Sequence, residues 1–268
     1  MKAKIIIAIF LCNLFLLGCS SNELKREQNL SAISITEHKQ LFGKYQEEGR
    51  LREYILFNED STIAEKKKYY YKDDKCITHK WTYIYDNKKR LIEENYYYID
   101  TLSLNNKKVF EYNEIDSVSK LHFYLGNGEL DTTFSFEYDN KKRLITKKEN
   151  DLILGTFISK YTYDTYLMRI DTYNEDTYWS TIIHEYDSFG NLLKQSYISA
   201  KNGQETIERQ NKYTYTSTGK IKHQESTHYE STIFKDFTYN DDETIQKIAL
   251  SYPNKHTKSE LRYNYIWK

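Results

Sequence analysis

An eight-residue string that occurs twice constrains this fold more than any other feature. Tyr-Asp-Asn-Lys-Lys-Arg-Leu-Ile runs from Tyr85 to Ile92 and again from Tyr138 to Ile145. Around it, pairs of aromatic residues separated by one position recur, with successive second aromatics 23 to 29 residues apart. That period is typical of repeat architectures. From Tyr85 onward the second aromatics are Tyr85, Tyr112, Tyr138, Tyr163, Tyr186, Tyr215, Tyr239 and Tyr265.

Each repeat predicts two strands joined by a turn. Two aromatics at a spacing of two point to the same face of a strand. An Asp or Asn after the second aromatic can bond its own backbone, and a glycine four residues after that aromatic accepts positive φ without steric cost. Lys89 and Lys142 occupy the glycine position in the duplicated copies, so there the turn must differ or carry strain. The predicted turn residues are Asp86, Asp139, Asp187, Gly190 and Gly219.

Composition favours strands over helices. The chain has 27 tyrosines and a single proline, and aliphatic residues are scarce, so tyrosine rings must supply much of the buried area. Apolar residues recur at a spacing of two between closely spaced turn signals, which is typical of strands. We therefore predict an all-β fold, an antiparallel meander of β-hairpins that forms a solenoid-like or curved open sheet. Residues 31–56 are the exception and predict an N-terminal cap, in which the polar stretch from Gln40 to Arg50 is either a short helix or irregular.

The N-terminus predicts export. Lys2 and Lys4 precede an apolar run that ends at Gly18, too short to cross a bilayer comfortably. Leu16, Leu17, Gly18 and Cys19 resemble a lipobox, although a smaller residue is usual at the Leu17 position. The resemblance implies cleavage before Cys19 and attachment of acyl chains such as palmitate, which anchor the chain in a membrane. The alternative is an ordinary signal peptide that contains a cysteine.

These observations divide the chain into four parts. We expect a signal-peptide helix at 1–18, the lipidated Cys19 with a flexible tether at 19–30, the cap at 31–56 and the repeat array at 57–268. Cys12 leaves with the signal peptide and Cys19 carries lipid, so only Cys76 remains and no intramolecular disulfide can form.

One turn also resembles a known repeat family. Residues Tyr186 to Leu192 read Tyr-Asp-Ser-Phe-Gly-Asn-Leu and resemble the YD repeat of Rhs-type proteins, Tyr-Asp-x-x-Gly-x-Leu. The copy that begins at Tyr215 lacks the aspartate, and the copies at Tyr85 and Tyr138 lack the glycine. The resemblance implies repeats that wind into a β-rich shell. Because only three residues follow Tyr265, we expect no toxin domain of the kind that long Rhs proteins enclose.

Nothing in the sequence predicts catalysis. No HExxH, GxSxG or CxxC motif is present, and the seven histidines are scattered over the repeats, so we expect no enzyme activity, no metal site and no cofactor. His184, His223 and His228 are the weak alternative for a metal. Basic and acidic residues number 39 each, which argues against nucleic acid as a partner.

Exposed aromatic residues are the one feature that favours a binding function. Rings on an open face of a sheet suit sugar rings or a protein partner, although the same rings can simply stack across strands. The candidate ligand contacts are Trp81, Tyr83, Tyr97 and Trp179.

The leading hypothesis is a lipid-anchored, non-catalytic protein of the cell envelope, in the outer membrane, that binds an envelope protein or a glycan. Serine after Cys19 permits sorting to that membrane. One alternative is an immunity or accessory lipoprotein for an Rhs-type toxin, and a weaker one is a glycan-active enzyme. Composition argues against an outer-membrane barrel, because these strands alternate aromatics with charged and polar residues on both faces.

Overall fold

The computed structural model describes residues 30–41, 44–45, 47–72, 75–98, 103–201, 204–229, 231–253 and 257–267. The predicted signal peptide, the lipobox residues Leu16, Leu17, Gly18 and Cys19, and most of the predicted tether lie outside the described residues. The described residues belong to two compact units. We call the one that reaches Thr133 and resumes at Ser259 the terminal unit, and the one from Phe134 to Lys258 the central unit. No helix in the described part of the chain is long and apolar enough to cross a membrane.

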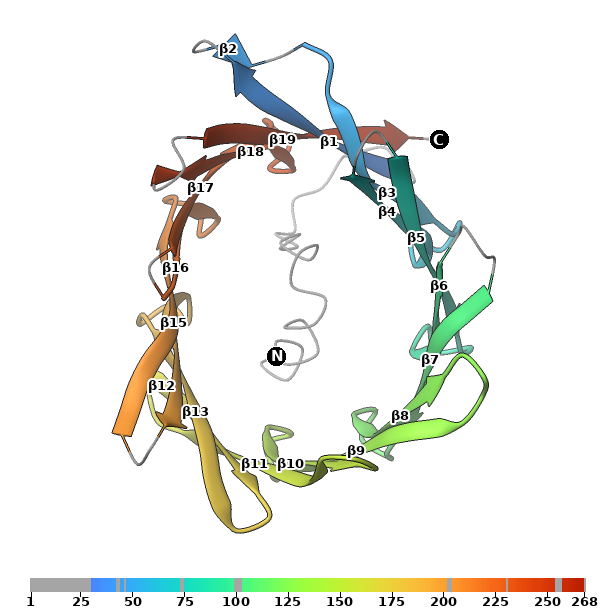
Figure 1. Ribbon diagram of the computed structural model, residues 1–268, viewed down its shortest axis with the longest axis vertical. Helices are drawn as coiled ribbons and strands as arrows, with labels where there is room; N and C mark the ends of the chain where they lie inside the picture. Colours follow the sequence, from blue (N-terminus) through green and yellow to red (C-terminus); the bar gives the residue numbers. More distant parts are fainter. Residues whose placement is uncertain are drawn as a thin grey trace. The chain divides into compact units, whose positions relative to one another are not determined.

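Antiparallel strands build the terminal unit (Figure 1). Its strands are β1 (Leu30–Leu41), β2 (Lys44–Tyr45), β3 (Arg50–Phe57), β4 (Ile63–Lys72), β5 (Lys75–Tyr85), β6 (Leu91–Tyr98), β7 (Ser103–Tyr112) and β8 (Val118–Leu125), with most of β19 (Thr257–Trp267). The strand β9 (Leu130–Tyr138) begins in this unit and ends in the central unit.

The central unit continues the same succession of hairpins. Its strands are β10 (Leu144–Asp151), β11 (Gly155–Tyr163), β12 (Leu167–Asn174), β13 (Thr177–Tyr186), β14 (Leu192–Lys201), β15 (Gln204–Tyr215), β16 (Ile221–His228), β17 (Ser231–Tyr239) and β18 (Ile245–Tyr252). From β10 to β18 each strand pairs antiparallel with the next along the chain. The all-β, antiparallel character of the chain therefore agrees with the prediction.

The prediction of an open or solenoid-like sheet is wrong. In an open meander the first and last strands are free edges. Here β1 pairs with β3 on one side and with β19 on the other, as Figure 1 shows, so the order of paired strands has no free end among the described strands. An Rhs-like solenoid, which the YD resemblance implied, is wrong for the same reason. Pairing the first strand with the last satisfies backbone groups that an open edge would leave exposed.

The cap at 31–56 is also not helical. Its residues form β1, the two-residue β2 and β3, because Ile33 and Ile35 alternate with smaller side chains and are buried in one row with Ile55, beside the partly buried Tyr263. Ile33 lies opposite Ile55, and Ile35 lies opposite Tyr263. The polar composition near Gln40 favoured a helix, but long-range pairing decides the conformation of β1.

In the sequence, an aliphatic residue stands six positions after most of the repeat aromatics, whereas Arg169 stands six positions after Tyr163. Cross-strand pairing explains this offset. The two residues are direct partners that close the hairpin, and the register shifts by one residue just before them, as a β-bulge does. The pairs are Phe57 with Ile63, Tyr85 with Leu91, Tyr112 with Val118, Tyr186 with Leu192, Tyr215 with Ile221 and Tyr239 with Ile245.

The aspartate that follows the tyrosine organises the turn. In the first duplicated copy, Asp86 Oδ1 accepts hydrogen bonds from the backbone amides of Lys88 and Arg90, both at 2.9 Å. The side chains of Asp139 and Asp187 accept the equivalent pair of backbone amides in their own turns. Backbone hydrogen bonds from Arg143 and Lys141, together with the Arg143 side chain, hold the pKa of Asp139 below its usual range.

All these turns place one residue in the left-handed region, four positions after the aromatic. Gly190 has a φ of 82° and Gly219 a φ of 80°. Lys89 and Lys142, at the same position, each have a φ of 60°. The Lys89 amide donates to Asp86 O at 2.9 Å and the Gly190 amide donates to Asp187 O at 3.0 Å, so the turn is the same. The duplicated copies therefore carry backbone strain that the glycine copies avoid.

A tyrosine hydroxyl connects successive repeats. In four repeats the second aromatic donates a hydrogen bond to the carbonyl of the offset-six residue in the preceding repeat. The pairs are Tyr112 to Leu91 (2.8 Å), Tyr163 to Leu144 (2.7 Å), Tyr215 to Leu192 (2.6 Å) and Tyr239 to Ile221 (2.7 Å). Burial raises the pKa of Tyr163 and of Tyr215 to about 12. The rings thus cover the preceding hairpin while their hydroxyls satisfy its backbone.

The duplicated string adds a second connection between repeats. Arg90 Nε donates to Asp86 Oδ2 at 2.7 Å, and its guanidinium carbon lies 4.5 Å from the centre of the Tyr112 ring. Arg143 repeats both contacts, with Asp139 at 2.7 Å and with the ring of Tyr163 at 4.7 Å. Each arginine therefore bridges its own turn to the tyrosine of the following repeat.

Candidate functional site

The four predicted ligand contacts occupy different places in the structure. Trp81 and Tyr83 lie on β5 and share a face of the terminal unit. Tyr97 is on β6 but points to the opposite face, because it lies between Tyr96, the partner of Trp81, and Tyr98. Trp179 belongs to β13 in the central unit, where it is 53% exposed and contacts Phe157 edge to face with ring centres 5.6 Å apart.

Five rings, Trp81 among them, meet around His79. Strand pairing sets Trp81 opposite Tyr96, and sets His79 opposite Tyr98 one row along. Tyr70 reaches the same group from β4 and packs edge to face on His79, with ring centres 4.7 Å apart. We call Tyr70, His79, Trp81, Tyr96 and Tyr98 the aromatic cluster. It lies on β4, β5 and β6, entirely within the terminal unit.

The rings of the aromatic cluster are stacked at its centre and tilted at its rim. The Trp81 and Tyr96 rings are 4.9 Å apart with an interplanar angle of 23°, and the His79 and Tyr96 rings are 5.5 Å apart at 13°. Tyr98 meets both His79 and Tyr96 edge to face, at 5.1 Å and 5.2 Å. Such pairs are worth about 0.5–1.5 kcal/mol each beyond the area they bury, so the packing holds the rings in place.

Polar contacts fix the central ring. The Tyr96 hydroxyl hydrogen-bonds His79 Nδ1, and burial together with a hydrogen bond to Tyr98 raises the pKa of Tyr96. Lys68 Nζ lies 6.0 Å from the centre of the Trp81 ring, at the limit of a cation–π contact.

The rim of the aromatic cluster remains accessible. Tyr70 is 47% exposed and Tyr98 is 42% exposed, although both contact other rings of the group. Tyr83, on the same face of β5, is half-buried, and burial raises its pKa. The accessible part of the aromatic cluster therefore presents flat, amphipathic rings with hydroxyl groups at their edges, which suit contact with a ligand that has both C–H and O–H groups.

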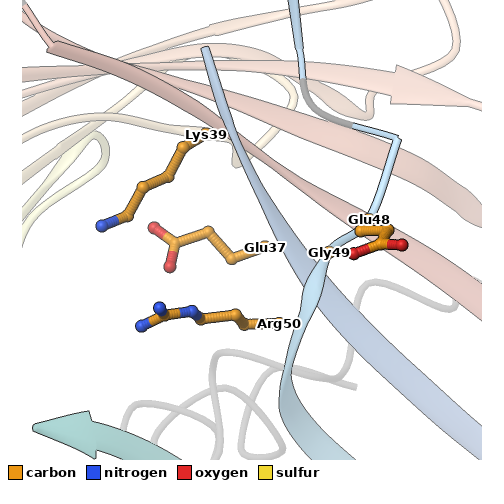
Figure 2. Close-up of a pocket in the computed structure, with 5 residues that line it drawn as sticks. All are labelled: Glu37, Lys39, Glu48, Gly49 and Arg50. Atoms are coloured by element: carbon orange, nitrogen blue, oxygen red, sulfur yellow. The ribbon is translucent and has the colours of Figure 1, made fainter. Parts of the chain in front are cut away.

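A second feature of the terminal unit is a pocket of about 260 Å³ beside β1 and β3. Figure 2 shows the side chains of Glu37, Lys39 and Arg50 pointing to one side of it. Glu37 is already bound by Arg52, whose Nε lies 2.7 Å from Oε2, and the Arg50 guanidinium lies over the ring of Tyr71 at 5.3 Å. Glu37 and Arg50 therefore already have partners, which makes this pocket a weaker candidate for ligand binding than the aromatic cluster.

Histidines form no metal site in the part of the chain that the structure describes. The three that were the weak candidates have separate partners. His184 Nε2 lies 2.8 Å from Gln195 Nε2, His223 Nδ1 lies 2.7 Å from Asp236, and His228 packs on Tyr229.

Sequence reasoning did not select His79, Tyr70 or Tyr98 as contacts. For Tyr98 the sequence does hold a signal, because alternate residues of a strand point to opposite faces. Tyr96 and Tyr98 therefore lie on one face of β6, and Tyr97 lies on the other. This alternation does not say which face of β6 lies beside Trp81, because that depends on the register between β5 and β6.

Comparison with known proteins assigns no family. No family model matches the chain, and no curated protein matches it. Among solved structures, a porin-like protein from Bacteroides uniformis is similar over 88% of this chain and 96% of its own, with a TM-score of 0.48 and 11% identity. A porin-like protein from Bacteroides vulgatus is similar over 90% of this chain and 99% of its own, with a TM-score of 0.35 and 12% identity.

A third solved structure, of TcdB2-TccC3-TEV, is similar over 84% of this chain but only 14% of its own, with a TM-score of 0.38 and 13% identity. At these identities and TM-scores, none of the three structures assigns an activity, a partner or a location to this chain.

Proposed function

We propose that this protein is a non-enzymatic, lipid-anchored component of the cell envelope and that the aromatic cluster binds a glycan. The observation that carries the proposal is a set of five mutually packed rings whose rim residues, Tyr70 and Tyr98, are each more than 40% exposed. A sugar ring offers C–H groups that pack on a flat aromatic face and hydroxyl groups that bond at its edge. Packing among the rings holds them in position before a ligand arrives, which lowers the entropic cost of binding.

The two carboxylates of β6, one of the strands that carry the aromatic cluster, support a binding role over a catalytic one. Glu94 Oε1 lies 2.7 Å from Lys108, and Glu93 lies 3.7 Å from Lys107. Adjacent strand residues point to opposite faces, so these two acids do not share a site. A glycoside hydrolase needs two carboxylates facing one substrate, one of them with a raised pKa.

The location rests on the sequence. The apolar N-terminal run and the lipobox-like residues Leu16 to Cys19 support export and lipid attachment at Cys19. Ser20 after the modified cysteine supports sorting to the outer membrane. An anchor there would keep the sheet close to envelope polysaccharides, where a weak sugar site acts at high local ligand concentration.

The test compares two neighbouring tyrosines on opposite faces of β6. The full chain, purified in mild detergent, is applied to immobilised polysaccharide prepared from its own cell envelope. We expect Tyr98→Ala to weaken retention about two- to tenfold, the loss of one ring contact, and Tyr97→Ala to leave it unchanged.

Equal retention of the Tyr98→Ala variant and the parent chain would show that the aromatic cluster does not bind the polysaccharide. Retention of an envelope protein instead of polysaccharide, weakened by the same variant, would replace the glycan with a protein partner. Circular dichroism of each variant establishes that the sheet is intact.

A further inference from the structure

The central unit contains a pocket of its own. It has a volume of about 320 Å³ and lies on β13, β14, β15 and β16. Small-molecule sites are typically about 300–1,000 Å³, so this pocket matches a ligand of one or two sugar rings. Its polar lining consists of Gln195, Tyr197, Glu208, Arg209, Asn211 and His228.

Strand pairing brings the first row of these side chains to one face. Tyr197 pairs with Ile182 on one side and with Arg209 on the other, and Arg209 pairs with His228. The register between β14 and β15 shifts next to Tyr197, which makes Glu208 the extra residue of a bulge. A bulge re-aims a side chain, and Glu208 accordingly lines the pocket beside its neighbour Arg209.

A hydrogen-bonded chain forms the second row. Asn211 Nδ2 donates to Gln195 Oε1 at 3.0 Å, and Gln195 Nε2 lies 2.8 Å from His184 Nε2. His184 is only 2% exposed, and burial lowers its pKa to about 4, so the ring is neutral near pH 7 and its Nε2 accepts from Gln195. Tyr186 OH lies 3.2 Å from His184 Nδ1 and completes the chain. The two pocket amides are therefore held in fixed orientations.

Arg209 indicates the charge of the ligand that this pocket suits. Among the described residues its guanidinium has no ion-pair partner, although Glu208 is adjacent in sequence. Arg209 is exposed at the pocket. An arginine that lines a pocket and has no carboxylate partner is available to an anionic ligand, because a guanidinium binds a carboxylate through two parallel hydrogen bonds. Other arginines of the chain do bind carboxylates, namely Arg52, Arg90, Arg143, Arg169 and Arg262.

The remaining groups suit a polyol more than a simple anion. Glu208 Oε1 accepts from Ser199 Oγ at 2.5 Å, and its carboxylate adds a negative charge that disfavours a doubly charged phosphate. Carboxylate and amide oxygens accept hydrogen bonds from hydroxyls, and the amide nitrogens donate to them. Tyr197 supplies a ring against which an apolar sugar face can pack.

We propose that this pocket binds a carboxylated sugar, a hexuronate unit of a polysaccharide. Arg209 holds the sugar carboxylate, Asn211 and Glu208 bond its hydroxyls, and Tyr197 packs on its ring. This site lies in the central unit and stands independently of the aromatic cluster of the terminal unit.

Calorimetric titration of the full chain with trigalacturonate and with its methyl ester tests the proposal. The ester has the same rings and hydroxyls but no negative charge. We expect the acid to bind at least tenfold more tightly than the ester, and Arg209→Gln to weaken binding of the acid by about tenfold to a hundredfold, the range for a charged hydrogen-bonded pair.

Lys212→Gln is the matched control. Lys212 lies on the same strand but on the opposite face, where its Nζ is 3.3 Å from Glu225, so this variant should bind the acid like the parent chain. Tyr98→Ala should also bind it normally, which separates this pocket from the aromatic cluster. The proposal is overturned if trigalacturonate does not bind, if acid and ester bind alike, or if Arg209→Gln binds as tightly as the parent chain.

Discussion

Replacing Lys142 with glycine should stabilise the protein, although it removes a charged side chain and adds freedom to the unfolded chain. Lys142 has a φ of 60°, whereas the equivalent positions in two other turns are glycines with φ near 80°. Its side chain is exposed and makes no ion pair among the described residues. Gly190 and Gly219 show that the same turn accommodates glycine.

The expected gain is the difference between two opposing effects. Left-handed backbone costs a residue with a side chain about 1–2 kcal/mol. Glycine increases the conformational entropy of the unfolded chain, which costs about 0.4–1 kcal/mol. The net increase in the free energy of unfolding is therefore about 0.5–1 kcal/mol, or about 1–4 °C in Tm for a chain of this size.

Urea unfolding followed by tryptophan fluorescence measures this gain. Lys141→Gly is the matched control, because Lys141 lies in the same turn without a positive φ, and we expect that change to destabilise by about 0.5–1 kcal/mol. The reverse change, Gly219→Ala, should destabilise by a similar amount through the backbone alone, since an added Cβ at that position meets nothing within 4 Å. A lower unfolding midpoint for Lys142→Gly, matching that of Lys141→Gly, would refute the strain argument.

Three further predictions concern the tyrosine hydroxyl bonds between repeats, the effect of pH on stability and the lipid anchor. Tyr215→Phe should lower the free energy of unfolding in urea by about 1 kcal/mol, because it removes the 2.6 Å hydrogen bond to Leu192 O. The same change at the exposed Tyr166 should leave that free energy unchanged, and equal unfolding midpoints for the two variants would contradict a stabilising role of the tyrosine hydroxyl bonds. The free energy of unfolding should fall as pH drops from about 6.5 to about 4, because His184 is protonated at a higher pH in the unfolded chain than in the folded chain. An unchanged pH profile in His184→Gln would exclude this residue as the cause. Cys19→Ala should abolish incorporation of labelled palmitate, and label retained in that variant would disprove lipidation at Cys19.

Local features of the fold were readable from the sequence. The offset of six between aromatic and aliphatic residues, and the position of the left-handed residue, depend only on the hairpin that contains them. The identity of the turn at Lys89 and Lys142 was not decided by sequence, since strain and a different turn were equally compatible with a lysine there. The structure has the strained form, with the backbone hydrogen bonds of the glycine turns.

Non-local features were not readable. Pairing of β1 with β19 joins residues at opposite ends of the chain, as Ala32 with Ile266, and no local pattern encodes it. The helical alternative for the cap is wrong because the partners of β1 are distant in sequence, whereas Glu47 to Gly49 are irregular, as the other alternative allowed. The grouping of the aromatic rings was not readable for a related reason. Of the predicted ligand contacts, Trp81 lies in the aromatic cluster and Tyr97 lies on the other face of β6, and this placement follows from the register of β6 with β5.

The position of β1 also sets an order of events when the chain is made. Ribosomes synthesise β1 first and β19 last, with the whole central unit between them. Until β19 emerges, the side of β1 that will receive β19 is an unpaired strand edge that carries Ile33 and Ile35, and such an edge is prone to pair with other chains. Contacts this distant in sequence form slowly. Completion of the sheet is therefore a late step, and a chain truncated before β19 should aggregate instead of folding.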